Sequence, residues 1–388
     1  MKLFSKKNKN KKPTLLGARA FGFWAGQGMA FHDPAGFVND LTESTRQQLA
    51  RVGCLLYAPP GANIKQFSDT HLETEVDDIF LGLSRELGLQ PSAFWPDNAP
   101  YALCLSHDID RVRRTYQAGA KKILRGRIPA GVKAIKSDVK DQANPFDNFE
   151  RISRFEQDLG IRSALYVLFE RRRLIRSLLH LEPQHLLGVY NPATIGHHLK
   201  NIAEQGFEIG LHGSFNSWRN RIALEREIQD LARIMGQEID GLGIRNHYLQ
   251  FNKISSTIQR QAGILYDSTL GFNFINGFRC STAFPFPLSF KHETPVELPL
   301  MIMDTALGVG TVREDFSIAD RIFEKAKQNH GMVMINWHQR YCNVDLAPGM
   351  CRWVEKSVKQ ARKDGAYICL PKEAAGFWLQ RVGEDVRS

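Results

Sequence analysis

The chain has 388 residues, of which 43% are hydrophobic and 24% charged, and its formal net charge is +10. This composition is close to the globular average, so it excludes a largely disordered chain and predicts a sizeable packed core. Six lysines lie in a basic polar tail at residues 1–13, which contains no acid, so the rest of the chain carries only +4. The overall charge therefore does not indicate a nucleic-acid-binding surface, and no nucleic acid is expected as a partner.

The cysteines are widely separated in the sequence. No Cys-x-x-Cys pair occurs, which excludes a zinc ribbon, a thioredoxin-like motif and a dense disulfide framework. Isolated thiols in a chain of this size are typical of reduced core residues, and they favour a cytoplasmic location. No apolar run approaches the ~20 residues that a transmembrane helix needs, so a soluble protein is expected.

Residues 14–95 are expected to form a small N-terminal accessory domain. Thr42–Val52 is compatible with a helix, Cys54–Tyr57 predicts a short strand, and the apolar spacing of Val76–Leu87 predicts a second helix. No catalytic motif is recognised in this region, and the proline-containing segment Phe94–Pro100 is interpreted as a linker. Truncation before this linker should therefore leave the second domain folded.

Residues 100–380 alternate short apolar runs with helical stretches. The predicted strands are Ala102–Ser106, Ser163–Phe169, Phe207–Leu211, Gly243–Arg245, Gly263–Tyr266 and Met332–Trp337. The predicted helices between them are Phe149–Leu159, Ala193–Gln205, Ala223–Met235, Ile254–Ala262 and Ile318–Asn329. This order predicts an α/β domain with a mostly parallel sheet. In such domains the chemistry lies at the carboxyl ends of the strands.

A basic stretch, Arg111–Lys136, follows the first of these strands. It contains nine basic residues and no acid. One interpretation is a solvated insertion. The other is a surface for an anionic partner, either a membrane surface or a phosphorylated glycan carrier, which would place the protein at the inner face of the membrane. Nucleic acid is disfavoured because Tyr116 is the only aromatic residue in the stretch.

Ionisable residues occur at the ends of most predicted strands. The first strand runs into His107-Asp108-Ile109-Asp110, which brings two carboxylates to one strand end. Because unpaired buried charge is costly, one carboxylate can bind a divalent metal while the other acts as a base; the alternative is the use of one Asp in a turn or helix cap. The other strand ends carry His212, Arg245, His247, Asp267 and His338.

Five short motifs occur in order between about Tyr101 and Ala375. They are His107-Asp108-Ile109-Asp110, Glu208-Ile209-Gly210-Leu211-His212-Gly213-Ser214, Gly243-Ile244-Arg245-Asn246-His247-Tyr248, Tyr266-Asp267-Ser268-Thr269 and Trp337-His338. Together they resemble polysaccharide deacetylases of the NodB-homology type (carbohydrate esterase 4-like), more narrowly the bacterial branch with a His-Asp-x-Asp first motif. The resemblance implies a distorted (β/α) barrel of seven or eight strands. It also implies hydrolytic removal of N-acetyl groups from a sugar of a bacterial surface polysaccharide or its precursor, so an N-acetylated glycan is the expected partner.

The same resemblance implies a divalent metal, usually zinc, held by Asp110 and His212. The family's second motif normally supplies another histidine four residues after the first, and here that position is Asn216. Its third motif normally has a proline where this chain has His247. Since imidazole is a good zinc ligand and an amide oxygen a weak one, His247 is the expected third ligand. A weaker two-ligand site and a lost metal remain as alternatives.

The resemblance also implies catalytic roles. Asp108 corresponds to the general base, Arg245 to the residue that orients the base, and His338 to the general acid. Asp267 corresponds to the carboxylate that supports the acid. Two other functions remain open on the residues alone: a non-catalytic carbohydrate-binding relative, which Asn216 favours, and an amidohydrolase of other C–N bonds.

Overall fold

The computed structural model describes residues 51–52, 55–56, 61–86, 94–112, 123, 126, 128–129, 132, 146–170, 190–289, 292–311, 314–343 and 346–387. The basic tail at residues 1–13 lies outside these ranges. So do the basic side chains of the stretch Arg111–Lys136 other than Arg111. The expected anionic surface partner therefore stays a prediction. None of the described helices combines the length and the apolar character needed to cross a membrane.

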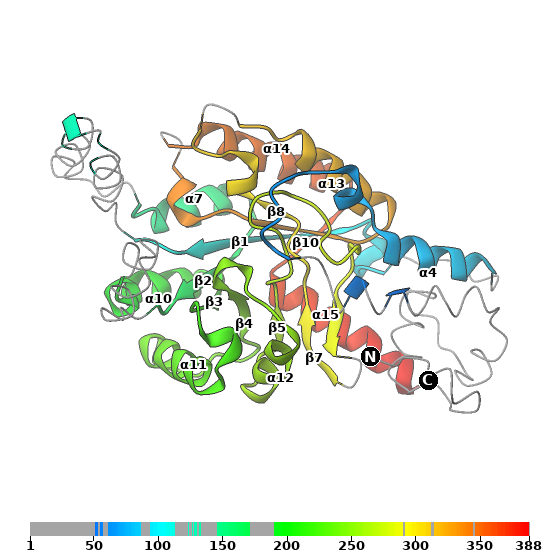
Figure 1. The fold of residues 1–388 in the computed structure, drawn as a ribbon, viewed down its shortest axis with the longest axis horizontal. Helices are drawn as coiled ribbons and strands as arrows, with labels where there is room; N and C mark the ends of the chain where they lie inside the picture. Colours follow the sequence, from blue (N-terminus) through cyan, green and yellow to red (C-terminus); the bar gives the residue numbers. More distant parts are fainter. Residues whose placement is uncertain are drawn as a thin grey trace.

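One mostly parallel, curled sheet of ten strands forms the centre of the described structure (Figure 1). The strands are β1 (Ala102–Ile109), β2 (Ala164–Leu168), β3 (Glu208–Gly213), β4 (Gly243–Asn246), β5 (Tyr266–Asp267), β6 (Phe286–Ser289), β7 (His292–Glu297), β8 (Ile302–Met303), β9 (Met332–Asn336) and β10 (Tyr367–Ile368). Their order is β6-β7-β5-β4-β3-β2-β1-β9-β8, and β10 pairs with the start of β1. Only the β6–β7 pair is antiparallel.

This half-barrel confirms the predicted α/β barrel-like fold. Five of the six predicted strands occur, whereas the strand predicted at Gly263–Tyr266 overlaps the two-residue strand β5 at Tyr266 alone. The β6–β7 hairpin and the two-residue strands β8 and β10 were not predicted, and the sheet has ten strands instead of the expected seven or eight. Such short strands carry too few residues for a periodic signal. The described residues Leu55 and Leu56 are helical, so the strand predicted at Cys54–Tyr57 is wrong there.

Helices flank the sheet as the alternating sequence pattern predicts. They are α4 (Glu75–Glu86), α7 (Phe149–Asp158), α10 (Gly196–Glu204), α11 (Arg221–Met235), α12 (Lys253–Gln261), α13 (Ser317–Gln328), α14 (Pro348–Lys363) and α15 (Pro371–Arg387). The helices predicted from Val76 onward begin and end within three residues of the observed ones, whereas α14 and α15 were not predicted. Most of the helix-compatible segment Thr42–Val52 lies outside the described residues. Helix α11 packs on β3, α13 on β9 and α15 on β1.

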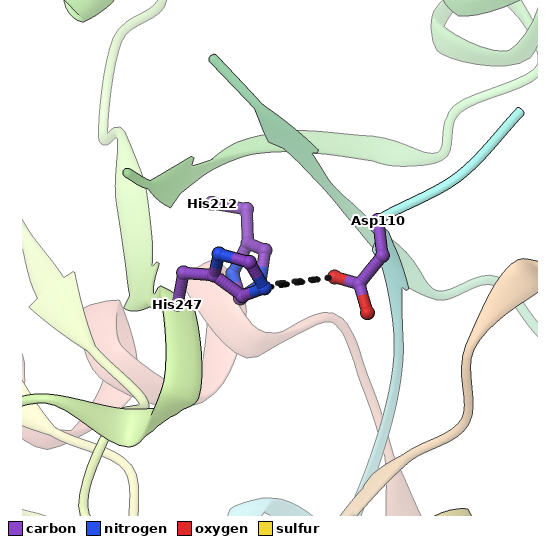
Figure 2. A group of neighbouring side chains, drawn as sticks. All are labelled: Asp110, His212 and His247. Atoms are coloured by element: carbon purple, nitrogen blue, oxygen red, sulfur yellow. Dashed lines mark ion pairs between the residues drawn. The ribbon is translucent and has the colours of Figure 1, made fainter. Parts of the chain in front are cut away.

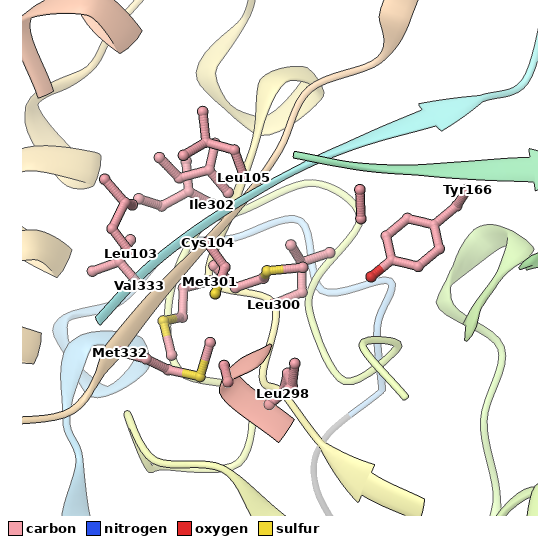
Figure 3. Packing of buried hydrophobic residues seen from close by; sticks show 14 of the residues in the cluster. Leu103, Cys104, Leu105, Tyr166, Leu298, Leu300, Met301, Ile302, Met332 and Val333 are labelled. Atoms are coloured by element: carbon pink, nitrogen blue, oxygen red, sulfur yellow. The ribbon is translucent and has the colours of Figure 1, made fainter. Parts of the chain in front are cut away.

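Strand β1 lies in the middle of the core. All eight of its residues are buried, because neighbouring strands and flanking helices cover both of its faces. Successive side chains alternate between the two faces: Leu103 and Leu105 pack beside Ile302 and Val333, and Cys104 points to the opposite face (Figure 3). The buried strand ends in polar residues, so the core holds their backbone rigidly at one edge of the sheet.

The N-terminal segment at residues 61–86 packs into the same core. Val76 and Phe80 of α4 are buried in the hydrophobic cluster that also contains β1. The segment interpreted as a linker is likewise packed: Trp95 is 2% exposed, and its indole Nε1 donates to the carbonyl of Gly331 at 2.7 Å. The separable accessory domain therefore stays a prediction that this packing does not favour.

Asp77 joins the N-terminal segment to the sheet domain. Its carboxylate accepts hydrogen bonds from Thr282 Oγ1 (2.5 Å), the backbone N–H of Ala283 (2.9 Å) and Asn329 Nδ2 (3.3 Å). We expect Asp77→Ala to lower the free energy of unfolding by about 2–3 kcal/mol, because it leaves buried hydrogen-bond donors of the sheet domain without an acceptor. Denaturant unfolding measures this. Exposed Asp78→Ala is the matched control, and equal stability of the two variants would support a separable N-terminal unit.

Candidate functional site

A pocket of about 330 Å³ opens at the carboxyl ends of the central strands. Asp108 and Asp110 reach it from the end of β1, His212 from β3, His247 from the residue after β4, and His338 from beyond β9. Parallel strands bring their carboxyl ends to one edge of the sheet. Five of the seven predicted site residues therefore line one pocket although they are scattered along the chain.

Three of these side chains form a group that could hold a metal ion. The donor atoms of Asp110, His212 and His247 all lie within 4.8 Å of one another, and Figure 2 shows both imidazoles beside the carboxylate. The Oδ1 atom of Asp110 is 3.3 Å from His212 Nε2 and 3.9 Å from His247 Nε2. Two imidazole nitrogens and one carboxylate oxygen are a donor set typical of catalytic zinc sites.

Two buried polar atoms of this group have no hydrogen-bond partner among the described residues. His212 Nδ1 donates to the backbone carbonyl of Arg245 at 2.7 Å, which leaves the Nε2 lone pair directed to the pocket. Within the described part of the chain, Asp110 Oδ1 is buried without a hydrogen-bond partner, and so is His247 Nδ1. The latter lies 3.8 Å from a carboxylate oxygen of Glu170, which can orient the ring. Buried polar atoms without partners are rare in proteins, and a bound ion would satisfy Asp110 Oδ1.

The carboxylate of Asp110 is held in its ionised form. Burial by itself would raise its pKa, but the neighbouring imidazoles of His338, His212 and His247 outweigh burial and keep the pKa well below the usual range. Metal binding requires an ionised carboxylate. Asp110 is therefore ready to bind a cation across the neutral pH range.

Asp108 is enclosed by donors on both of its oxygens. Arg245 Nη1 donates to Oδ1 and Asn336 Nδ2 to Oδ2, each at 2.8 Å. Burial would raise the pKa of this carboxyl, but the Arg245 guanidinium, followed by His212, lowers it below the usual value. Arg245 is itself fully buried and lies 4.5 Å from the ring of Tyr166. The predicted contact between Asp108 and Arg245 is therefore present.

His338 is paired with a carboxylate that the sequence did not single out. Its Nδ1 lies 2.8 Å from Asp304 Oδ1, and its backbone N–H donates to Asp304 Oδ2 at 2.7 Å. Its Nε2 points to Asp110 Oδ2 at 3.1 Å. Burial and Arg340 lower the pKa of His338, but Asp304 and Asp110 outweigh them and raise it to about 9. The imidazole is therefore protonated at neutral pH.

Asp267 does not contact His338, so its predicted place beside the acid is wrong. Its carboxylate accepts hydrogen bonds from Thr269 and from Gln259 Nε2, the latter at 2.8 Å. Asp267 lies on β5, at the far side of the sheet from β9, whereas Asp304 follows β8, the neighbour of β9. The strand order therefore gives Asp304 the position that the motif resemblance assigned to Asp267.

Asn216 and Glu170 compare differently with the sequence analysis. Asn216 Oδ1 accepts a hydrogen bond from Arg219 at 3.0 Å. Glu170 was missed, although it directly follows the predicted strand Ser163–Phe169 and the strand-end rule covers it. No comparable signal marked Asp304, since the two-residue strand before it was not predicted.

A buried acidic group lies behind the site. Glu208 accepts a hydrogen bond from the Tyr266 hydroxyl and another from the backbone N–H of Lys372 at 3.0 Å. The Tyr266 hydroxyl is 2.9 Å from that of Tyr166, on which Arg245 packs. Burial raises the pKa of Glu208 to about 7, although both hydrogen bonds oppose this shift. The carboxyl is therefore protonated in mildly acidic solution.

This raised pKa predicts how stability depends on pH. Between the unfolded pKa of about 4.3 and the folded value near 7, the folded protein binds the extra proton, so stability falls as pH rises. Relative to Glu208→Gln, the wild type should lose about 2 kcal/mol of unfolding free energy between pH 5.5 and 8.5. Urea unfolding at both pH values measures this. Exposed Glu204→Gln should keep the wild-type dependence, and an unchanged Glu208→Gln profile would contradict the prediction.

Comparisons with known proteins give similarities of structure alone. No family model and no curated protein matches the chain. Similar solved structures include a "probable Polysaccharide deacetylase" from Pseudomonas aeruginosa PAO1, with 13% identity over 75% of this chain and 95% of that chain and a TM-score of 0.48. An allantoinase has 12% identity over 74% and 93%, with a TM-score of 0.46. BA3943, a CE4 family pseudoenzyme from Bacillus anthracis, has 8% identity over 71% and 65%, with a TM-score of 0.36. At these values the similarities do not distinguish among the activities of these proteins.

Proposed function

We propose that this protein is a metal-dependent hydrolase that removes N-acetyl groups from a sugar of a bacterial surface polysaccharide or its precursor. One observation carries the proposal: a single pocket holds an ionised carboxylate, Asp108, and a protonated imidazole, His338, beside a group of metal-ligand type. Amide hydrolysis needs a base for the water and an acid for the leaving nitrogen. The motif resemblance supports the same assignment.

Asp110, His212 and His247 would hold the metal. They fit a divalent cation because their donor atoms lie within 4.8 Å of one another and Asp110 Oδ1 lacks any other described partner. Two imidazoles favour zinc over magnesium or calcium, which prefer oxygen ligands. When bound, the cation would polarise the acetamido carbonyl and lower the pKa of water.

Asp108 would act as the general base. It is ionised, and it lies beside the candidate metal ligands, with Oδ2 3.9 Å from His212 Nε2. Arg245 and Asn336 hold its oxygens in place, so the carboxylate accepts the proton of the attacking water without reorienting. Loss of the Arg245 charge would raise the pKa of this carboxyl and weaken its pairing at the same time.

His338 would act as the general acid. Asp304 engages its Nδ1, and its Nε2 faces Asp110 Oδ2 at 3.1 Å, so with the Asp110 carboxylate bound to a cation the proton on Nε2 would be available to the leaving amine. Asp304 therefore fixes the orientation of the ring and stabilises its protonated form, in the way that a buried carboxylate supports a catalytic histidine. The base reaches the pocket from β1, and the acid reaches it from beyond β9, the neighbouring strand. The residues of the candidate metal group come from the ends of β1, β3 and β4.

Acetate release tests the proposed function. The purified full chain, loaded with one equivalent of zinc, is incubated with N-acetylhexosamine oligomers and, separately, with cyclic imides and ureides. We expect acetate and free amine from the N-acetylated sugars, with loss of both on chelation and recovery on adding zinc. Turnover of the cyclic compounds alone would assign an amidohydrolase. Glycan binding without bound metal or turnover would assign a non-catalytic carbohydrate-binding protein.

A further inference from the structure

Two guanidinium groups line the pocket and have no part in the proposed proton transfers. Arg340 lies two residues after His338, and Arg111 directly follows Asp110. The side chain of Gln339 donates a hydrogen bond to the backbone carbonyl of Arg111, so the two segments that carry these arginines are held together. Both cations therefore border the space where substrate would lie against the metal ligands.

Arg340 is largely buried, with 13% of its side chain exposed. Its Nη1 lies 3.3 Å from Asp110 Oδ2, and the guanidinium lies 4.9 Å from the ring of Tyr341, which fixes its plane. A guanidinium carries five N–H donors, and a single carboxylate oxygen at this distance engages one of them. The planar group suits a carboxylate or phosphate, which can accept two parallel hydrogen bonds from it.

Arg111 contributes a second cation to the same pocket. Within the described ranges its guanidinium forms no ion pair, and it lines the pocket beside Asp110. A third cation, Lys65, lies 5.5 Å from the ring of Phe274, another lining residue, which is 51% exposed. The two arginines thus bring positive charge into the pocket, and Lys65 adds a cation beside one of its lining residues.

The acidic residues of the pocket do not neutralise these arginines when a divalent cation is bound to Asp110. Asp108 is paired with Arg245, which lies behind the pocket. Glu170 accepts a hydrogen bond from the backbone N–H of Phe215 at 2.8 Å and lies on the His247 side of the site. A divalent cation on Asp110 would take up its charge and leave Arg340 and Arg111 in excess. A ligand with a negative group gains most from such a pocket.

We propose that the substrate sugar carries an acidic substituent, a carboxylate or a phosphate, and that Arg340 and Arg111 bind it beside the scissile acetamido group. This inference rests on the proposed function for the identity of the sugar. It adds a specificity that the metal group and the base–acid pair do not supply. The two arginines are binding residues, so their loss should raise KM for acidic sugars far more than it lowers kcat.

Ligand binding to the zinc-loaded full chain tests the inference. Isothermal titration at low ionic strength compares N-acetylglucosamine with N-acetylglucosamine 6-phosphate and with N-acetylmuramic acid, whose acidic group is a carboxylate. We expect the acidic sugars to bind at least about 10-fold more tightly than the neutral one, as for hydrogen bonds to charged groups. Arg340→Gln should reduce this preference about 10-fold with zinc content unchanged. Exposed Arg219→Gln, the matched control, should keep it.

The contradicting results are separable from a failure of the proposed function. Equal binding of neutral and acidic sugars, or equal weakening of both by Arg340→Gln, would overturn the inference. If Arg340→Gln weakened the binding of free acetate but not that of the acidic sugars, the inference would also be overturned, because Arg340 would then contact the released product. If Arg340→Gln does not fold, Arg111→Gln gives the same comparison. A preference for acidic sugars without acetate release would overturn the proposed function instead.

Discussion

His212→Ala is expected to abolish stoichiometric zinc binding. His212 is 2% exposed, and its Nε2 is the closest imidazole nitrogen to Asp110 Oδ1 in the candidate metal group. Loss of residues that merely orient ligands costs about 10–100-fold in affinity, so loss of a ligand should cost more than about 100-fold. Elemental analysis and competition with a chromogenic chelator measure zinc content and affinity.

His247 and Asn216 provide the matched comparison. His247→Ala should weaken zinc binding strongly because its Nε2 belongs to the candidate group. Asn216→Ala should have little effect, since the Asn216 side chain is engaged by Arg219. A larger loss of affinity in Asn216→Ala than in His247→Ala would show that the third ligand is wrongly assigned. Full zinc content in all three variants would place the metal elsewhere.

Asp108→Asn is expected to reduce turnover by about 10²–10⁴-fold while the protein keeps its zinc. The amide has nearly the same shape but cannot accept the proton of the attacking water. Asp108 Oδ2 lies 3.9 Å from His212 Nε2, and Asp108 is not part of the candidate metal group. Acetate release and zinc content are measured on the same sample.

Two controls make this result decisive. Because Arg245 is fully buried and pairs with Asp108, the free energy of unfolding of Asp108→Asn must be measured as well. Asn336→Ala removes a hydrogen bond to the same carboxylate but leaves its charge, so it should lose much less turnover. A variant Asp108→Asn that loses zinc together with activity would make Asp108 a ligand, and the base would have to be another group.

His338 should set the alkaline limb of the activity profile. The acid must be protonated, so turnover should fall as pH rises through the pKa of His338, which Asp304 and Asp110 raise and which a cation bound to Asp110 would lower again. Asp108 must be ionised, and its lowered pKa puts the acid limb below the usual carboxyl range. His338→Gln should remove the alkaline limb and keep zinc. A limb that stays in place in this variant would contradict the assignment of the acid.

Much of the fold follows from local patterns in the sequence. Five of the six predicted strands and the helices between them carry clear apolar periodicity and occur where predicted, whereas the strand predicted at Gly263–Tyr266 shares only Tyr266 with β5. The spacing of Asp108 and Asp110 puts both side chains on the same side of an extended segment, because alternate residues of a strand share a face. With parallel strands, the polar strand ends then meet at one edge, so the pocket itself could be anticipated.

The tertiary structure decided which groups become partners. Asp304 pairs with His338 because β8 lies next to β9, and this adjacency depends on a two-residue strand with no periodic signal. Asp267 has the motif's residue type but lies on β5, too far across the sheet. The N-terminal segment likewise joins the core through Asp77, whose hydrogen bonds reach residues about 200 positions away. Sequence periodicity reports the elements and their buried faces, whereas strand order and long-range packing, which involve no local spacing, determine the contacts between them.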